Sequence, residues 1–235
     1  MSTRGILLSN STCHGREYLD HAIDDIAELL GGATRVVFVP FALHDHAAYG
    51  AKAADRLRRI GLKVTTILED GRAARLVAEA EAIFVGGGNT FRLLDRLVRN
   101  GILAPIRQRA LAGMPYLGAS AGTVIAGPTI KTTNDMPIVH PASLDALGLV
   151  PFQLNCHYLD PDPASTHMGE SRETRLREFH EENETAVLGL REGAWLRAEG
   201  GRVLLGGTAG AKLFVRGRAP AEQPPGADLS ALCAR

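Results

Sequence analysis

Short apolar runs alternate with longer amphipathic stretches through the first half of this chain. The apolar runs are rich in β-branched residues and are bounded by glycine, proline or polar residues, a pattern typical of buried strands. This pattern predicts strands at residues 5–10, 35–41, 62–68, 81–90 and 114–120. Between them, apolar residues recur three and four positions apart, which predicts helices at 18–30, 49–61, 73–80, 90–101 and 104–113.

Strands that alternate with helices predict an α/β fold, with a mostly parallel sheet flanked by helices on both faces. The second half is less regular, with strands predicted at 152–159, within 185–196 and at 202–207, and a charged helix at 169–183. Because no linker or repeat divides the chain, residues 1–216 are expected to form a single α/β domain. Residues 217–235 are rich in proline, glycine and alanine, and we expect a loosely held C-terminal extension there.

The composition of the chain mainly argues against certain classes of partner and site. The 26 basic and 26 acidic side chains balance, so charge gives no reason to expect nucleic acid or an anionic membrane as a partner. The three cysteines (Cys13, Cys156 and Cys233) have no CxxC spacing, which argues against a disulfide framework or a thiolate metal site. The apolar run at 6–8 is too short for a signal peptide, and no run is long enough to span a membrane. We expect a cytoplasmic protein.

The stretch "MPYLGASAG" carries the clearest chemical signal. Ser120 lies between Gly118 and Gly122, after an apolar strand and before small residues that could begin a helix. In this context the Gly-x-Ser-x-Gly pattern is typical of a nucleophile elbow, a tight turn that exposes the serine oxygen above the sheet edge. The amide of Ala121 would then point into the cleft and hold an oxyanion. A glycine-rich turn whose serine caps a helix explains the motif equally well.

A nucleophilic serine needs a base, and the base needs an orienting acid. His157 ends the apolar run "FQLNCH", where ligands gather outside the carboxyl ends of parallel strands. Its neighbour Cys156 is expected to point the other way, into the core. Asp135, in a polar loop, and Glu192, after a strand, are both candidate acids. Spacing does not choose between them, although a carboxylate fixed at a strand end favours Glu192.

The segment "GGGNT" at 86–90 follows a buried strand and precedes a helix. Its bare backbone amides could cradle a phosphate or supply a second oxyanion donor. The dinucleotide-binding pattern is broken at Phe91, and no Gly-Lys-Ser/Thr follows. An oxyanion role for Gly88 is therefore favoured over nucleotide binding.

Eight short motifs occur in order between residues 6 and 196: "LLSNST", "FVPFA", "VGGGNTF", "GASAGT", "TTNDMPIV", "FQLNCH", "GESRETR" and "GLREGAW". Together they closely resemble the peptidase E family of α-aspartyl dipeptidases, serine peptidases related to cyanophycinase. The resemblance implies a flavodoxin-like or class I glutamine amidotransferase-like fold. It implies hydrolysis of Asp-Xaa dipeptides with a serine nucleophile and no metal, and we expect no other cofactor. Family members are often dimeric, so a homodimer is expected.

The resemblance also assigns roles to individual residues. Ser120 matches the family nucleophile and His157 its base, while Asp135 and Glu192 both match positions of catalytic importance. We take Glu192 to orient His157, and Asp135 to shape the site or attract the substrate ammonium. Arg172, in "GESRETR", is suited to bind the substrate's carboxylate through two hydrogen bonds, and Asn89 is expected to help recognise the aspartate side chain. Without the resemblance, Arg172 would be one charge among many on a solvated helix.

Two departures bear on substrate preference. Cys156 replaces a proline of the relatives, and the turn after His157 differs, which leaves the preferred leaving residue open. A cyanophycinase-like isoaspartyl peptidase would share the same triad and cleave β-aspartyl bonds. A non-catalytic protein that binds aspartate or peptides is the alternative from another class, and a nucleotide-binding protein comes third.

Overall fold

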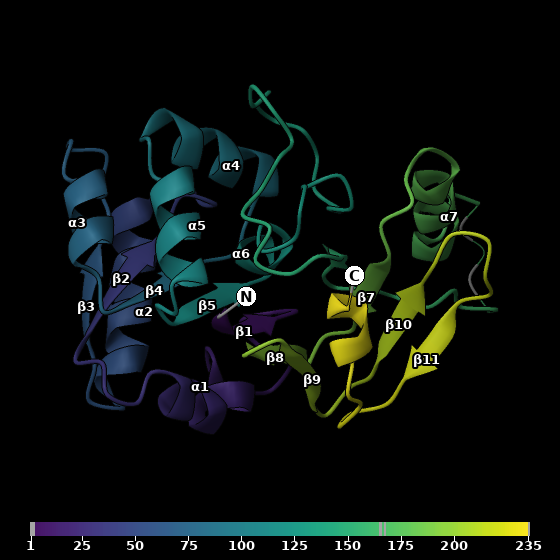
Figure 1. Ribbon diagram of the computed structural model, residues 1–235, viewed down its shortest axis with the longest axis horizontal. Coiled ribbons are helices and arrows are strands. Elements are labelled where there is room, and N and C mark those ends of the chain that lie inside the picture. Colours follow the sequence, from purple (N-terminus) through teal and green to yellow (C-terminus); the bar gives the residue numbers. More distant parts are fainter. Residues whose placement is uncertain (1–2, 165, 167, 235) are drawn as a thin grey trace.

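The computed structural model describes residues 3–164, 166 and 168–234. Its larger sheet has seven strands in the order β3-β2-β4-β5-β1-β8-β9 (Figure 1). The first five of these strands run parallel, and β8 and β9 add an antiparallel edge. The strands are β1 (Arg4–Leu8), β2 (Arg35–Val39), β3 (Lys63–Thr66), β4 (Ala82–Val85), β5 (Tyr116–Ala119), β8 (Ala194–Glu199) and β9 (Arg202–Gly207). The predicted α/β class with a mostly parallel sheet is confirmed.

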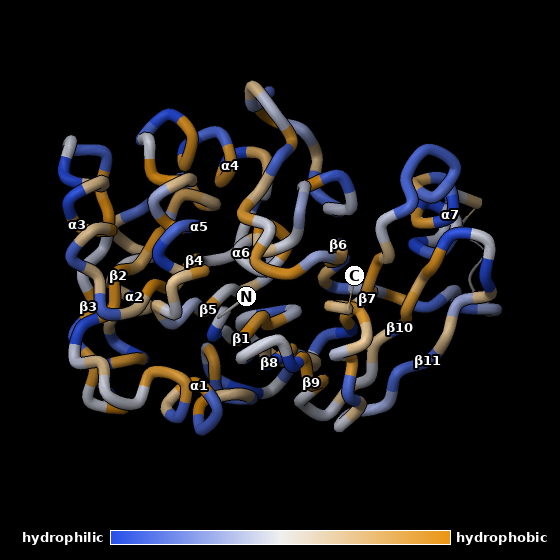
Figure 2. The backbone as a smooth tube through the Cα atoms, in the orientation of Figure 1, coloured by the Kyte–Doolittle hydropathy of each residue, from blue (hydrophilic) through white to orange (hydrophobic). Residues whose placement is uncertain are grey.

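Helices cover both faces of this sheet, because alternate strand residues point to opposite sides. Ile6 and Leu8 pack on one face with α1 and α2, while Leu7 packs on the other face with α3, α4 and α5. Figure 2 shows hydrophobic and hydrophilic residues alternating along these helices. The helices are α1 (Ile23–Leu29), α2 (His46–Arg58), α3 (Ala73–Glu79), α4 (Thr90–Arg99), α5 (Leu103–Leu111), α6 (Ala121–Val124) and α7 (Arg172–Glu182).

A second sheet, which the sequence pattern did not predict, lies beside the first (Figure 1). Its order is β11-β10-β7-β6, with β6 and β7 parallel and the other pairs antiparallel. Its strands are β6 (Gln153–Asn155), β7 (Val187–Leu190), β10 (Ala211–Phe214) and β11 (Ala221–Gln223). Leu176 of α7 packs on this sheet against Tyr158, Val187 and Phe214. The turn after β7 leads directly into β8, so residues 191–193 join the two sheets.

The C-terminal segment differs from the expected loose extension. β11 pairs with β10, and the amide of Leu229 donates to the carbonyl of Val203 at 2.7 Å. A short 3₁₀ helix, η2 (Ser230–Cys233), then packs beside β9. The backbone pairing therefore fixes this segment despite its proline- and glycine-rich composition, and the boundary at residue 217 stays a prediction.

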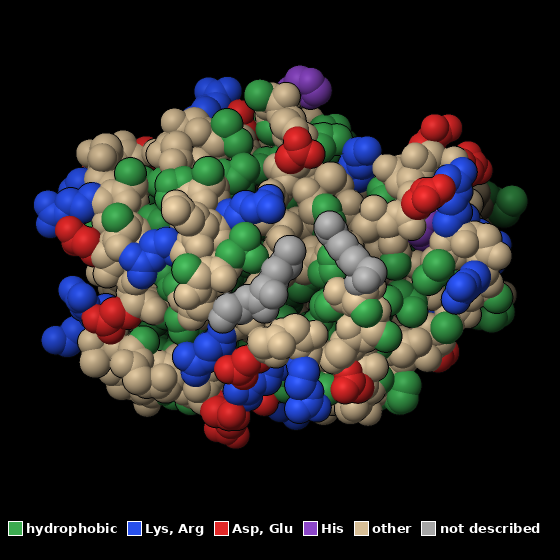
Figure 3. Space-filling view, in the orientation of Figure 1, with side chains coloured by type: hydrophobic (Ala, Val, Ile, Leu, Met, Phe, Trp, Pro, Cys, Tyr) green, Lys and Arg blue, Asp and Glu red, His purple; other side chains and the backbone are tan. Residues whose placement is uncertain are grey.

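The surface mixes charges of both signs. Figure 3 shows Lys and Arg side chains interspersed with Asp and Glu across the visible face. No helix within residues 3–164, 166 and 168–234 is long and apolar enough to cross a membrane.

Candidate active site

Ser120 occupies a sharp turn between β5 and α6. Its backbone has φ 50° and ψ −109°, and its amide donates to the carbonyl of Leu8 on the neighbouring strand at 3.0 Å. A non-glycine residue in such a conformation is strained by about 1–3 kcal/mol, so the surrounding structure must hold it there. This is the geometry expected of a nucleophile elbow.

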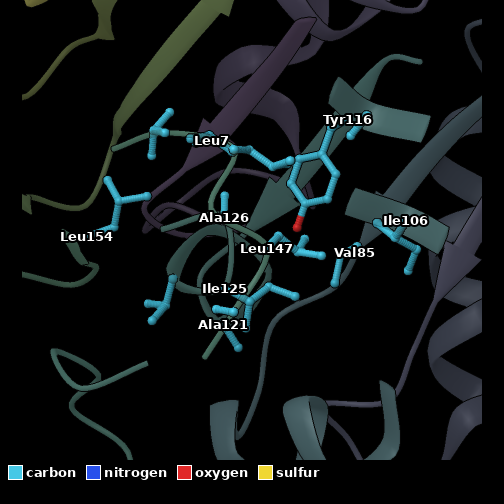
Figure 4. Close-up of a cluster of buried hydrophobic side chains, with 14 of the residues drawn as sticks. Leu7, Val85, Ile106, Tyr116, Ala121, Ile125, Ala126, Leu147 and Leu154 are labelled. Atoms are coloured by element: carbon cyan, nitrogen blue, oxygen red, sulfur yellow. The ribbon is translucent and has the colours of Figure 1, made fainter. Parts of the chain in front are cut away.

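The two glycines of the motif permit close backbone packing around Ser120. A Cβ on Gly122 would lie 2.1 Å from the carbonyl oxygen of Val85, and one on Gly118 would lie 2.6 Å from the carbonyl oxygen of Gly122. Beneath the turn, the buried hydroxyl of Tyr116 donates to that same Gly122 oxygen at 2.6 Å. Figure 4 shows Tyr116 in the apolar cluster with Val85 and Ala121. Gly122 is therefore required by its contact with β4, and Gly118 by its contact with the Gly122 backbone.

Ser120, His157 and Glu192 form one hydrogen-bonded chain. The Ser120 Oγ lies 2.9 Å from Nε2 of His157, and Nδ1 of His157 lies 2.7 Å from Oε1 of Glu192. The three side chains come from three places: the end of β5, the end of β6 and the turn that joins β7 to β8. His157 therefore follows a strand of the smaller sheet, not the larger parallel sheet at whose edge it was predicted. The triad assembles where the two sheets meet.

Two buried residues that sequence reasoning missed position this chain. The Ser9 hydroxyl accepts from the backbone amide of His157 at 2.9 Å and donates to the carbonyl of Leu190 at 2.8 Å. The Asn10 side-chain oxygen accepts from the amide of Gly193 at 2.8 Å, which fixes the turn carrying Glu192. Both are polar residues directly after a buried strand, which is the signal that could have identified them.

Asp135 lies in the same pocket as Ser120 but contacts other groups. Its Oδ2 accepts from the backbone amide and hydroxyl of Thr90, at 2.8 and 2.6 Å, and from the hydroxyl of Thr133 at 3.1 Å. These bonds hold the loop at the N-terminus of α4, where the helix dipole favours a carboxylate. Of the two candidate acids, Glu192 is the one that hydrogen-bonds His157.

The glycine-rich loop leaves one amide available. The Gly86 amide donates to the carbonyl of Val39, and the Asn89 amide donates to the carbonyl of Ala42. The Gly87 amide donates to the hydroxyl of Tyr49, and the Thr90 amide donates to the carboxylate of Asp135. The amide of Gly88 has no acceptor within the described part of the chain, and neither does that of Ala121 at the start of α6. Gly88 and Ser120 line the same pocket, of about 420 Å³. Neither predicted oxyanion donor is thus paired with an acceptor among the described residues, and their role toward a substrate oxygen stays a prediction.

The two predicted substrate-binding residues lie around this centre. Asn89 caps α4: its side-chain oxygen accepts from the amide of Arg92 at 3.0 Å, and its side-chain nitrogen donates to the carbonyl of Met136 at 2.9 Å. Arg172 begins α7 and lines a different pocket from the one that contains Ser120. Burial lowers the pKa of the Arg172 guanidinium, while the charge of Asp135 acts in the opposite direction. The roles of Asn89 and Arg172 toward substrate stay predictions.

Cys156 is buried, as predicted. Burial raises the pKa of its thiol, with the nearby charge of Asp135 adding to the effect. The thiol therefore stays protonated and is a poor nucleophile.

The described residues also contain no cluster of three or more His, Cys, Asp or Glu side chains suited to a metal ion.

Comparison with known proteins identifies a family model and close relatives. The model described as "Peptidase family S51" matches residues 6–206. "Peptidase E" of Streptomyces coelicolor is 56% identical over 227 residues, covering 97% of this chain and 93% of its own length. "Probable alpha-aspartyl dipeptidase" of Drosophila melanogaster is 46% identical over 230 residues, covering 97% of this chain and 96% of its own.

Solved structures share the fold at lower identity. A peptidase from an acI-B1 Actinobacterium aligns with a TM-score of 0.74 at 16% identity, covering 97% of both chains. A putative peptidase E protein from Listeria monocytogenes EGD-e aligns with a TM-score of 0.68 at 24% identity, covering 89% of this chain and all of its own.

Proposed function

The chain belongs to peptidase family S51, and from this premise we propose that it hydrolyses dipeptides with an N-terminal aspartate, using Ser120 as its nucleophile. The single observation that carries the proposal is the hydrogen-bonded chain from Ser120 through His157 to Glu192. The relatives named for peptidase E and α-aspartyl dipeptidase activity supply the substrate class.

The geometry supports an acyl-enzyme mechanism. His157 Nε2 accepts the Ser120 proton as the oxygen attacks the Asp-Xaa carbonyl, and Glu192 stabilises the imidazolium that forms. The amides of Gly88 and Ala121 receive the oxyanion, where a single donor is typically worth about 3–4 kcal/mol of barrier. His157 then protonates the departing amine, and water hydrolyses the aspartyl ester on Ser120.

The charges around the pocket suit an aspartyl substrate. The described donors to Asp135 all bind Oδ2, so Oδ1 is free to accept from the substrate ammonium. Although burial lowers the pKa of the Arg172 guanidinium, the charge of Asp135 acts on that pKa in the opposite direction. In the proposed complex, Arg172 binds the aspartyl side-chain carboxylate. These roles explain why the site needs both a fixed anion and a nearby guanidinium.

A substrate panel tests the proposed function. Asp-Leu, β-Asp-Leu, Glu-Leu and Ala-Leu are incubated with the wild-type protein and with Ser120→Ala. We expect cleavage of Asp-Leu alone, and its loss in the variant. Preferential cleavage of β-Asp-Leu would move the protein to the isoaspartyl peptidases, and cleavage of none would favour a binding protein.

Substitutions of Glu192 and Asp135 are expected to change different kinetic parameters. Glu192→Gln removes the charge that stabilises the imidazolium, so kcat should fall by about 10²- to 10⁴-fold with little change in KM. Asp135→Asn keeps the His157 contacts and weakens ammonium binding, so mainly KM should rise. Steady-state kinetics on Asp-Leu measure both. A larger fall in kcat for Asp135→Asn than for Glu192→Gln would reverse the two assignments.

We further propose that the protein acts in the cytoplasm, in the breakdown of peptides to amino acids. The three cysteines are free, which suits a reducing compartment. A homodimer stays a prediction, to be tested by sedimentation.

A further inference from the structure

The Ser120 pocket contains a cation that the mechanism above does not use. Lys52 of α2 lines this pocket together with Ser120 and Gly88. Its ammonium lies 4.6 Å from the centre of the Tyr18 ring, a distance at which cation and ring attract each other. Lys52 is otherwise exposed, and the contact with the ring places its ammonium at the pocket wall.

The charge of Lys52 is not neutralised by the protein. Other cations of α2 pair with carboxylates, including Arg56 with Asp20 and Arg58 with Asp55. Lys52 forms no ion pair with any of the described residues. Burial raises the pKa of the Tyr18 hydroxyl, which therefore remains neutral and gives Lys52 no phenolate partner.

The helix that carries Lys52 is fixed beside the glycine-rich loop of the site. Tyr49 lies three residues earlier on α2, so the two side chains share one helix face. The Tyr49 hydroxyl accepts from the amide of Gly87 at 2.8 Å, next to the oxyanion donor Gly88. This bond fixes the helix that carries Lys52 against the loop that carries the oxyanion site.

An Asp-Xaa dipeptide offers more charges than the proposed function has assigned. It carries one ammonium and two carboxylates, and Asp135 and Arg172 account for the ammonium and the aspartyl side chain. The pocket lined by Arg172 shares no described lining residue with the pocket of Lys52. Lys52 is therefore a cation separate from Arg172 and Arg175, which line the other pocket.

We propose that Lys52 binds the C-terminal carboxylate of the leaving residue and thereby restricts the enzyme to dipeptides. The inference rests on the proposed function. In a longer peptide or a peptide amide this carboxylate is replaced by a neutral amide, which cannot pair with the ammonium. Lys52 is thus a specificity-determining residue for the leaving side of the substrate.

The test compares Asp-Leu with Asp-leucinamide, which differ at this carboxylate. The wild-type protein should prefer Asp-Leu in kcat/KM. Lys52→Gln should lower kcat/KM for Asp-Leu by about 10-fold, the size expected for one charge-assisted hydrogen bond, and leave Asp-leucinamide nearly unchanged. Lys52→Arg should retain most of the preference. Lys63→Gln, the same charge change on β3 outside the described pocket lining, should match wild type.

An equal loss on both substrates in Lys52→Gln would overturn the proposal, since it would place Lys52 at the aspartyl side or in the scaffold. An unchanged preference would overturn it as well. If the wild-type protein cleaves neither substrate, the proposed function fails. Calorimetry then measures the binding of both compounds to the Ser120→Ala variant, with and without Lys52→Gln, and so tests the role of Lys52 separately from catalysis. Tighter binding of Asp-Leu than of Asp-leucinamide, lost on adding Lys52→Gln, would support the carboxylate site; equal binding of the two would overturn it.

Discussion

Ser120→Ala is expected to lower kcat/KM for Asp-Leu by about 10⁴- to 10⁶-fold. The reason is that the serine oxygen lies 2.9 Å from Nε2 of His157 and is the atom that we propose attacks the substrate carbonyl. Without that oxygen, the oxyanion donors and the binding charges can only support slow attack by water. The measurement is single-turnover hydrolysis with enzyme in excess, which detects very low rates.

The fold should survive this change, because the variant loses only one partly exposed hydrogen bond, worth about 1 kcal/mol. Ser120→Gly serves as a second variant. It should be equally inactive, and more stable than Ser120→Ala because glycine relieves the strain of φ 50°. Wild-type turnover by either variant would show that Ser120 is not the nucleophile.

Gly122→Ala is expected to destabilise the protein by about 3 kcal/mol, because the new Cβ meets backbone rather than a flexible side chain. Its nearest neighbour would be the carbonyl oxygen of Val85, at 2.1 Å. For a chain of this size that corresponds to a fall in Tm of about 6–12 °C. The elbow must also shift to relieve the clash, so kcat/KM should fall by about 10²-fold.

Gly61→Ala is the matched control for this prediction. Gly61 has φ +83° with open space around it, so the substitution adds only backbone strain, of about 1–2 kcal/mol. It lies at the end of α2, away from Ser120, and should keep full activity. If Gly122→Ala proved no more damaging than Gly61→Ala, a glycine at position 122 would not be needed for packing against β4.

The larger sheet could be predicted from the sequence because four of its parallel strands (β1, β2, β4 and β5) are largely buried and form continuous apolar runs. Ser120 could be found for a related reason: its glycines are required by local contacts that leave a short, recognisable motif. The acid that orients His157 could not be chosen from sequence spacing. Asp135 precedes His157 and Glu192 follows it, and either separation along the chain is compatible with a triad. Only the folded chain places Glu192 against Nδ1 of His157.

The second sheet could not be predicted because an apolar run does not specify which strand it will pair with. The run at 152–159 has the same appearance whether it joins the first sheet or, as β6 does, pairs with β7. The pairing of β11 was missed for a similar reason, since its backbone bonds depend on β10 and not on its own composition. Lys52 was missed because a single lysine in a helical sequence has no distinguishing motif. Its position over the Tyr18 ring and in the Ser120 pocket is visible only in the folded chain.

The central claim is that cleavage passes through an aspartyl ester on Ser120, and nucleophile partitioning tests it most directly. Asp-Leu, Asp-Ala and Asp-Phe are hydrolysed in a fixed concentration of hydroxylamine, and the ratio of aspartyl hydroxamate to aspartate is measured. A common acyl-enzyme has already lost its leaving residue, so the account predicts the same ratio for all three substrates. A ratio that changes with the leaving residue, or hydrolysis with no hydroxamate formed, would contradict it.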